Sequence, residues 1–177
     1  DLNSFNTSNV QNMYFMFYGN ESLTSLNIKN FDTSKVVDMN SMFGELEKIT
    51  SLDVSGFNTS KVKSMEGMFS HCYALKAVDV SHFNTSEVVK MGYMFNSCSS
   101  LESLNLSKFN TSSVNDARCM LYYMDDLKTL KTIPNLKCSI ELPFTMSDSS
   151  GKKYTTMPTN SKSITLKAAA SKPVVRK

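Results

Sequence analysis

The stretch FNTSKVKSMEGMF at residues 57–69 decides the fold, because the chain repeats this pattern in register over most of its length. The leading Phe recurs every 26 residues, followed each time by Asn or Asp, then Thr-Ser, then Val two residues later. The five copies begin at Phe5, Phe31, Phe57, Phe83 and Phe109. Self-similarity at such a period indicates a repeat architecture, in which stacked copies bury one continuous core.

Each copy predicts a short helix followed by a strand. Apolar residues fall at spacings of three and four from Val62 to Phe69, which is typical of one helix face. The Asn or Asp that precedes this segment would supply the helix N-cap. In the second half, residues 75–81 alternate apolar and small polar side chains, which predicts a strand with one buried face.

The methionines belong to the predicted core. Nine of the 12 Met residues lie in two columns of the repeat, beginning at Met13 and Met16. Met fills irregular gaps in apolar interiors, so this count favours core packing over a metal or redox role. We expect the Phe, Val and Met columns to form the interior of the stack.

The strand segments resemble known bacterial surface repeats. Residues 101–106 match the leucine-rich core L-x-x-L-x-L, and residues 69–80 and 95–106 resemble BspA-like leucine-rich repeats. The FNTS half is similar to the 26-residue repeat of Listeria surface proteins and mycoplasma lipoproteins. The resemblance covers residues 1 to about 133. It implies an α/β fold: a right-handed leucine-rich-repeat-like solenoid of about five rungs, each a short helix plus a strand of one parallel sheet.

The periodic pattern divides the chain into three predicted parts. Residues 1–133 form the repeat region, which begins within a repeat at Asp1, so an upstream part is expected to be missing. Residues 134–167 predict a β-rich cap with strands near 138–146, 154–157 and 163–166. A cap is expected because the end of a stack exposes apolar core and an unpaired strand edge. Residues 168–177 are expected to be a linker or tail.

Charge and composition exclude several classes of function. Residues 1–130 carry 10 basic and 14 acidic side chains, whereas residues 131–177 carry 9 basic and 2 acidic ones. The excess of basic charge therefore lies in residues 131–177, after the repeats. The repeats therefore lack the clustered basic surface that nucleic-acid binding needs. No apolar run is long enough to span a membrane. With two His and no C-x-x-C pair, we predict no metal site and no cofactor.

One polar column of the predicted sheet face is a candidate ligand-binding ladder, formed by Asn27, Asp53, Asp79 and Asn105. Like-charged carboxylates that stack in neighbouring strands repel each other, so the presence of Asp at adjacent positions of this column calls for a structural or functional explanation. Three readings stay open. It is a solvated polar ladder, a contact surface for a protein or glycan, or a Ca²⁺ site, although a hard cation needs more oxygens than each copy supplies.

Cys72 and Cys98 occupy the same column of adjacent copies, at a predicted spacing that a disulfide could bridge. The alternative, two buried unpaired thiols, is favoured because free Cys packs as a small apolar residue. No catalytic residue is predicted. His71 adjoins Cys72 without a third group to orient a base–nucleophile pair.

These observations predict a non-enzymatic module of the bacterial cell surface. The leading hypothesis is an extracellular adhesion domain, monomeric, that binds a host or neighbouring-cell protein through the concave sheet face. A carbohydrate-binding module on the same face is the alternative, although that face offers no aromatic side chains for stacking on sugar rings. A spacer without a ligand is the third possibility.

Overall fold

The computed structural model describes residue 2 and residues 4–169, and this part of the chain is all-β. It contains seven strands and no helix within those residues. The strands are β1 (Ser51–Leu52), β2 (Ala77–Val78), β3 (Ser103–Asn105), β4 (Thr129–Lys131), β5 (Glu141–Ser147), β6 (Lys153–Thr156) and β7 (Thr165–Ala168). The predicted α/β solenoid of helix-plus-strand rungs was therefore wrong. Of the predicted tail at 168–177, Ala168 belongs to β7, and residues 170–177 lie outside the described residues.

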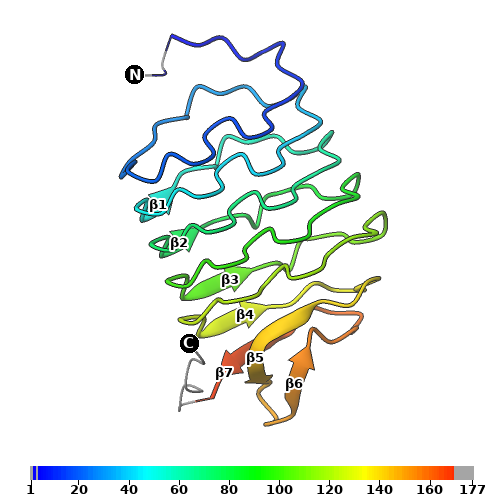
Figure 1. The fold of residues 1–177 in the computed structure, drawn as a ribbon. Coiled ribbons are helices and arrows are strands. Elements are labelled where there is room, and N and C mark those ends of the chain that lie inside the picture. The colour runs from blue at the N-terminus through cyan, green and yellow to red at the C-terminus, as the bar shows by residue number, and fades with distance from the viewer. Residues whose placement is uncertain (1, 3, 170–177) are drawn as a thin grey trace.

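Successive repeats lie over one another in register. Strand β1 pairs with β2 and β3 with β4, both in parallel, and every paired residue is matched with its counterpart 26 positions on. Isolated parallel bridges with the same offset run from Asn12 to Asp116 through all five repeats. We call each repeat a rung, taking the rungs as residues 5–30, 31–56, 57–82, 83–108 and 109–134. Figure 1 shows β1 to β4 as one column along the stack.

The residues expected to form a helix make a turn segment in each rung instead. A helix would return each N–H to the carbonyl four residues earlier. In the second rung, alternate N–H groups donate to the next rung at 2.8–3.0 Å, and those between them close local turns. The inter-rung donors are Met39, Ser41, Phe43 and Glu45, and their acceptors are Ser64, Glu66, Met68 and Ser70. The backbone bonds therefore run along the stack, as in a sheet.

Two columns of left-handed residues explain how this segment avoids the helix. Both columns repeat every 26 residues, with φ between 50° and 71°. They comprise Phe15, Ser41, Gly67, Tyr93 and Cys119 in the first, and Gly19, Glu45, His71, Ser97 and Tyr123 in the second. Each non-glycine member costs on the order of 1 kcal/mol of backbone strain. Because only two of these ten positions are Gly, the usual sequence signal for a left-handed turn is missing.

The interior consists of the predicted Phe, Val and Met columns, with exceptions in the first rung. The rings of Phe17, Phe43, Phe69 and Phe95 stack in series, with centroids 5.5–5.9 Å apart. Phe69 and the Met residues beside it are fully buried. Phe5 and Met16 belong to the same columns but are exposed at the edge of the first rung. Each buried ring excludes water from both neighbouring rungs, so the rungs depend on one another for their core.

A column of buried Thr side chains links the rungs through the backbone. Thr59 Oγ1 accepts the N–H of Asn84 at 2.8 Å and donates to the carbonyl of the same residue at 3.0 Å. The same pair of bonds joins Thr7 to Asp32, Thr33 to Asn58 and Thr85 to Asn110. One hydroxyl thus satisfies two backbone groups of the next rung. The preceding Asn or Asp, expected as a helix cap, accepts the N–H two residues on within a turn, as Asn58 does from Ser60 at 3.0 Å.

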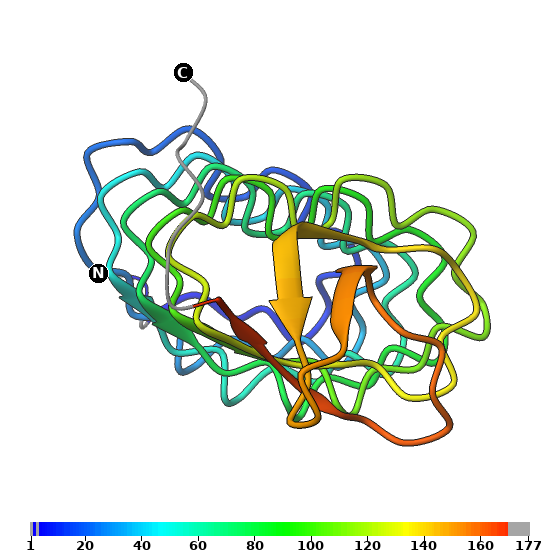
Figure 2. The same cartoon turned by 90° about the horizontal axis from the view of Figure 1, so that it is seen from below.

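The C-terminal strands extend the sheet of the last rungs. Strand β7 pairs antiparallel with β4, and the five-stranded sheet has the order β3-β4-β7-β5-β6. Thr132 and Ile164 exchange two further bonds at 2.9 Å beside this pairing. The three strands fall close to the predicted positions. Figure 2, a view along the stack, shows β5 and β6 crossing the open end of the coils, where they cover the last rung.

Candidate ligand-binding surfaces

Three members of the polar ladder predicted on the sheet face, Asp53, Asp79 and Asn105, lie at or just after strands, and all four side chains are engaged within their own rungs. Asp53 Oδ1 accepts the N–H and the hydroxyl of Ser55 at 3.1 and 2.6 Å. Asn105 bonds Ser107 in the same two ways. Asp79 accepts the N–H of Ser81 at 2.9 Å, and Asn27 that of Lys29 at 3.4 Å. Each member therefore accepts the N–H two residues on and shapes a local turn.

The pKa shifts of the two carboxylates in this ladder reflect their hydrogen bonds within their own rungs. Hydrogen bonds from Ser55 lower the pKa of the Asp53 carboxyl, and those from Ser81 lower the pKa of Asp79. Lys29 Nζ lies 4.0 Å from Asp53 Oδ2 and adds a favourable charge. The repulsion expected between stacked carboxylates is offset locally. No group of three or more His, Cys, Asp or Glu side chains in the described part of the chain could hold a metal ion.

Cys72 and Cys98 are buried and unpaired in the structure. Their thiols donate to the carbonyls of Phe43 and Phe69, both at 3.1 Å, so each thiol reaches the preceding rung. Burial raises the pKa of Cys72 to about 12 and that of Cys98 well above its usual range. Both behave as core side chains with a weak donor, and neither is poised as a nucleophile.

The exposed aromatic side chains lie elsewhere, on the turn segments. These segments run across the core from β1 and β2 (Figure 2), and we call their outward surface the turn face. The rings on or next to it that are at least 36 % exposed belong to Tyr14, Phe15, Tyr18, Tyr73, Tyr93 and Tyr123. Sequence reasoning missed this face because it treated the segment as a helix. A signal was present: the columns that begin at Tyr14, Phe15 and Tyr18 change identity between copies, whereas the neighbouring Met columns hardly do.

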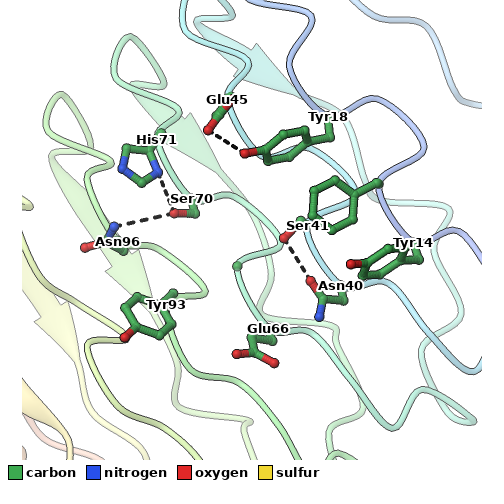
Figure 3. Close-up of a pocket in the computed structure, with 12 residues that line it drawn as sticks. Tyr14, Tyr18, Asn40, Ser41, Glu45, Glu66, Ser70, His71, Tyr93 and Asn96 are labelled. Atoms are coloured by element: carbon green, nitrogen blue, oxygen red, sulfur yellow. Dashed lines mark hydrogen bonds between the residues drawn. The ribbon is translucent and has the colours of Figure 1, made fainter.

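A hollow of about 380 Å³ opens on the turn face across rungs one to four. Tyr14, Phe15 and Tyr18 form one wall, where Phe15 packs its ring against both tyrosines at 4.2 and 4.3 Å between centroids. Tyr93 and Asn96 stand at the opposite side (Figure 3). The floor between them belongs to the second and third rungs.

Two columns of the repeat have small side chains in both the second and the third rung, and the space that these side chains leave forms the hollow. Between Phe15 and Tyr93, the first column holds Ser41 and Gly67. The second column begins at Tyr18 and continues with Gly44 and Ser70. A Cβ atom at Gly67 would lie 2.9 Å from Ser41 Oγ, and one at Gly44 would lie 2.9 Å from the Tyr18 ring. Larger side chains at these positions would close the space.

Neutral polar side chains cover much of the hollow (Figure 3). Ser70 Oγ lies 2.8 Å from His71 Nδ1, and Asn96 Nδ2 donates to Ser70 Oγ over a long 3.5 Å. Ser41 donates to Asn40 Oδ1 at 2.8 Å. These groups offer both donors and acceptors toward the opening.

The two carboxylates of the hollow differ in their partners. Glu45 accepts the phenol of Tyr18 at 2.5 Å, and this bond raises the pKa of Tyr18. The Glu66 carboxylate has no hydrogen bond or ion pair with any residue that the structure describes, although its charge helps raise the pKa of Arg118. One carboxylate thus fixes a wall tyrosine and the other stays open to solvent.

Comparison with known proteins places the repeat in a family. The family model described as "Mycoplasma protein of unknown function, DUF285" matches residues 1–78 and, in an overlapping second match, residues 48–137. The chain belongs to the DUF285 family. The resemblance to mycoplasma repeats is confirmed at this coarser level. Neither the curated proteins nor the solved structures contain a match.

A second hollow of about 370 Å³ in this DUF285 chain borders the fifth rung and the start of β5. Arg118 is held against Asp116 at 2.6 Å, and Tyr122 donates a hydrogen bond to Glu141, which raises the Tyr122 pKa to about 12. Its charged side chains are therefore each engaged with a neighbour. No helix in the described residues is long and apolar enough to cross a membrane.

Proposed function

We propose that the chain is a non-catalytic recognition module of the bacterial cell surface, which contacts a protein on a host or neighbouring cell through its turn face. The observation that carries this proposal is the set of exposed rings on that face. Tyr is enriched at the centres of protein interfaces because its rigid ring buries much area at little entropic cost. The finer relationship to BspA-like and Listeria surface repeats, and the extracellular location, belong to the same proposal.

The turn face is favoured over the sheet face because it carries exposed aromatic rings. One oxygen of each carboxylate, Oδ1 of Asp53 and of Asp79, accepts hydrogen bonds from its own rung, so part of each group is engaged before a partner arrives. The rings of Tyr14 and Tyr93 project into the hollow and solvent (Figure 3). Binding energy comes most readily from apolar area that is exposed before the partner arrives.

A binding role is also favoured over catalysis by the geometry around Ser70. Its hydroxyl touches His71 Nδ1, which is the contact that could suggest a nucleophile and a base. The other ring nitrogen, Nε2, has no partner among the described residues that could orient the imidazole. Nucleophilic catalysis needs that third group to fix the base.

The proposal is tested by binding of the labelled chain to a cell layer and to a panel of extracellular-matrix proteins. The variant Tyr14→Ser/Tyr18→Ser/Tyr93→Ser should bind at least about tenfold more weakly, since each ring of a recognition surface commonly contributes 1 kcal/mol or more. The matched control, Asp53→Ala/Asp79→Ala, should bind as the parent does. Loss of binding in the control alone would assign recognition to the sheet face. No binding by the parent chain would favour a spacer.

A further inference from the structure

We infer that the hollow on the turn face is a saccharide-binding subsite, which takes one neutral hexose or N-acetylhexosamine residue. This inference rests on the proposed function, because the sugar would belong to a glycan displayed on the contacted surface. A sugar site on the sheet face would lack aromatic side chains for stacking, and the hollow does not have that difficulty. Aromatic side chains are missing there, and they surround the hollow here.

The shape of the hollow suits a ring-shaped ligand. Its volume of about 380 Å³ lies at the small end of the range for ligand pockets, which is roughly 300–1,000 Å³. The wall rings at Phe15 and Tyr93 belong to the same column three rungs apart, so they stand on either side of the small residues Ser41 and Gly67. Aromatic faces can pack on the C–H faces of a sugar ring, while the floor stays within reach of its hydroxyl groups.

The polar groups of the hollow match hydroxyl and acetamido groups. Asn96 is only 8 % exposed, lines the hollow, and makes one long hydrogen bond through its Nδ2 atom. A buried amide with unused capacity gains from a ligand that both donates and accepts, as a hydroxyl does. Across the floor, Asn40, Ser41 and Ser70 add further side chains that can both donate and accept hydrogen bonds (Figure 3).

Charge selects against anionic saccharides, and the hydrogen-bonding groups of the hollow favour a sugar over a basic peptide. Glu45 and Glu66 line the hollow, and no Lys or Arg does, so sialylated or sulfated sugars would be repelled. A cationic side chain would find one open carboxylate, Glu66, because Glu45 accepts the phenol of Tyr18, so a cationic ligand has to be tested beside the sugar. The neutral hydrogen-bonding side chains Asn40, Ser41, Ser70 and Asn96 therefore favour a polyhydroxyl ligand.

The first test is a titration of the isotope-labelled chain by NMR with N-acetyllactosamine and with its 3′-sialylated form. We expect saturable shifts confined to the hollow with the neutral sugar, at a Kd on the order of 1 mM. The sialylated sugar should bind at least tenfold more weakly. Equal binding of the two, or shifts outside the hollow, would overturn the inference, and so would binding of acetyl-arginine amide in competition with the neutral sugar.

Two variants test the site itself. Ser41→Tyr places a phenol in the column that already holds Phe15 and Tyr93 with the same positive φ, so it fills the hollow without new backbone strain. It should abolish sugar binding, and Tyr93→Ala should weaken it about tenfold by removing one wall. Asp53→Ala, on the opposite side of the core, should leave it unchanged. Retained sugar affinity in Ser41→Tyr would overturn the inference.

The cell-binding assay separates this inference from the proposed function. Treatment of the cell layer with glycosidases should remove most binding of the parent chain if a glycan fills the hollow. Binding that survives glycosidases but is lost in the triple tyrosine variant would overturn the saccharide subsite and leave protein recognition intact. Binding that survives both treatments would overturn both proposals.

Discussion

The strand side and the turn side of the stack repeat through the same rungs with the same 26-residue offset, yet they hold the rungs together differently. On the strand side, two or three residues per rung pair as parallel strands. On the turn side, four alternate N–H groups per rung reach the next one, although the segment contains no regular strand. The side that looks irregular therefore contributes at least as much inter-rung hydrogen bonding.

The two sides also differ in what they leave free. On the strand side, Asp and Asn oxygens accept hydrogen bonds within their own rung. On the turn side, the left-handed column of Phe15, Ser41, Gly67 and Tyr93 varies in size from a bulky ring to no side chain at all. The paired strands and the exposed, variable side chains thus lie on opposite sides of one core. A recognition surface can then vary without disturbing the bonds that build the stack.

The largest expected effect is on stability and comes from the inner side of the turn segments. Phe69→Ala removes a fully buried ring that stacks on Phe43 and Phe95, so the free energy of unfolding should fall by about 4 kcal/mol. On the strand side, Val78→Ala removes a half-buried side chain and should cost roughly 1 kcal/mol. Urea unfolding measures both. Equal losses would show that the two sides contribute equally to the core.

The second prediction concerns the Thr column between the two sides. Thr59→Val keeps the shape but leaves the N–H and carbonyl of Asn84 without their partner, and should cost about 2–3 kcal/mol. Thr59→Ser keeps the hydroxyl and should lose clearly less. If the Val variant proved as stable as the Ser variant in thermal unfolding, the hydroxyl would not link the rungs.

The third prediction is a pH dependence of the strand side. Hydrogen bonds from Ser55 and Ser81 lower the folded-state pKa values of Asp53 and Asp79. A lowered pKa contributes stability that is present above the unfolded value of about 4 and is lost as the pH falls through the folded value. Asp53→Asn/Asp79→Asn keeps the acceptor oxygens, as Asn105 does, and should flatten this acid dependence. Urea midpoints between pH 2 and 7 measure it, and an unchanged slope would contradict the assignment.

The smallest expected effect is local to the turn side. Glu45→Gln should bring the raised pKa of Tyr18 back toward its ordinary value, because the bond to a carboxylate is its main cause. Stability near neutral pH should change little, since the pair is exposed. The matched control, Glu47→Gln, should lower the pKa of Tyr73 and leave Tyr18 alone. NMR titration of ring carbons resolves the two, and a shift of Tyr18 in the control would refute the pairing.

Much of the interior could be predicted from the sequence, because packing constrains residue type. Phe43, Met65 and Val88 are fully buried, as the repeat columns indicated. The helix was predicted wrongly because apolar residues at spacings of three and four also suit a segment whose turns have a similar period. The hydrogen bonds that separate the two structures join residues 25 positions apart, which a local pattern cannot reveal.

The candidate site was beyond local reasoning for a related reason. Asp53 and Asp79 were picked out as an exposed charged column, and one oxygen of each accepts hydrogen bonds from the serine two residues on. The hollow depends on small residues at Ser41, Gly67 and Ser70 being adjacent across rungs, while their bulky counterparts flank them. Each residue alone is unremarkable. Only their positions in space make a site.

The sequence by itself determined the period, the number of repeats and which columns face the core, because burial of apolar side chains in stacked copies requires identity at fixed intervals. The tertiary structure decided how the backbone N–H groups are shared. Where a neighbouring rung offers carbonyl oxygens, alternate N–H groups bond along the stack, and left-handed residues turn the chain to allow it. Because these hydrogen bonds form between rungs and not within one, the segment is not a helix, and its outward side chains form the turn face and the hollow.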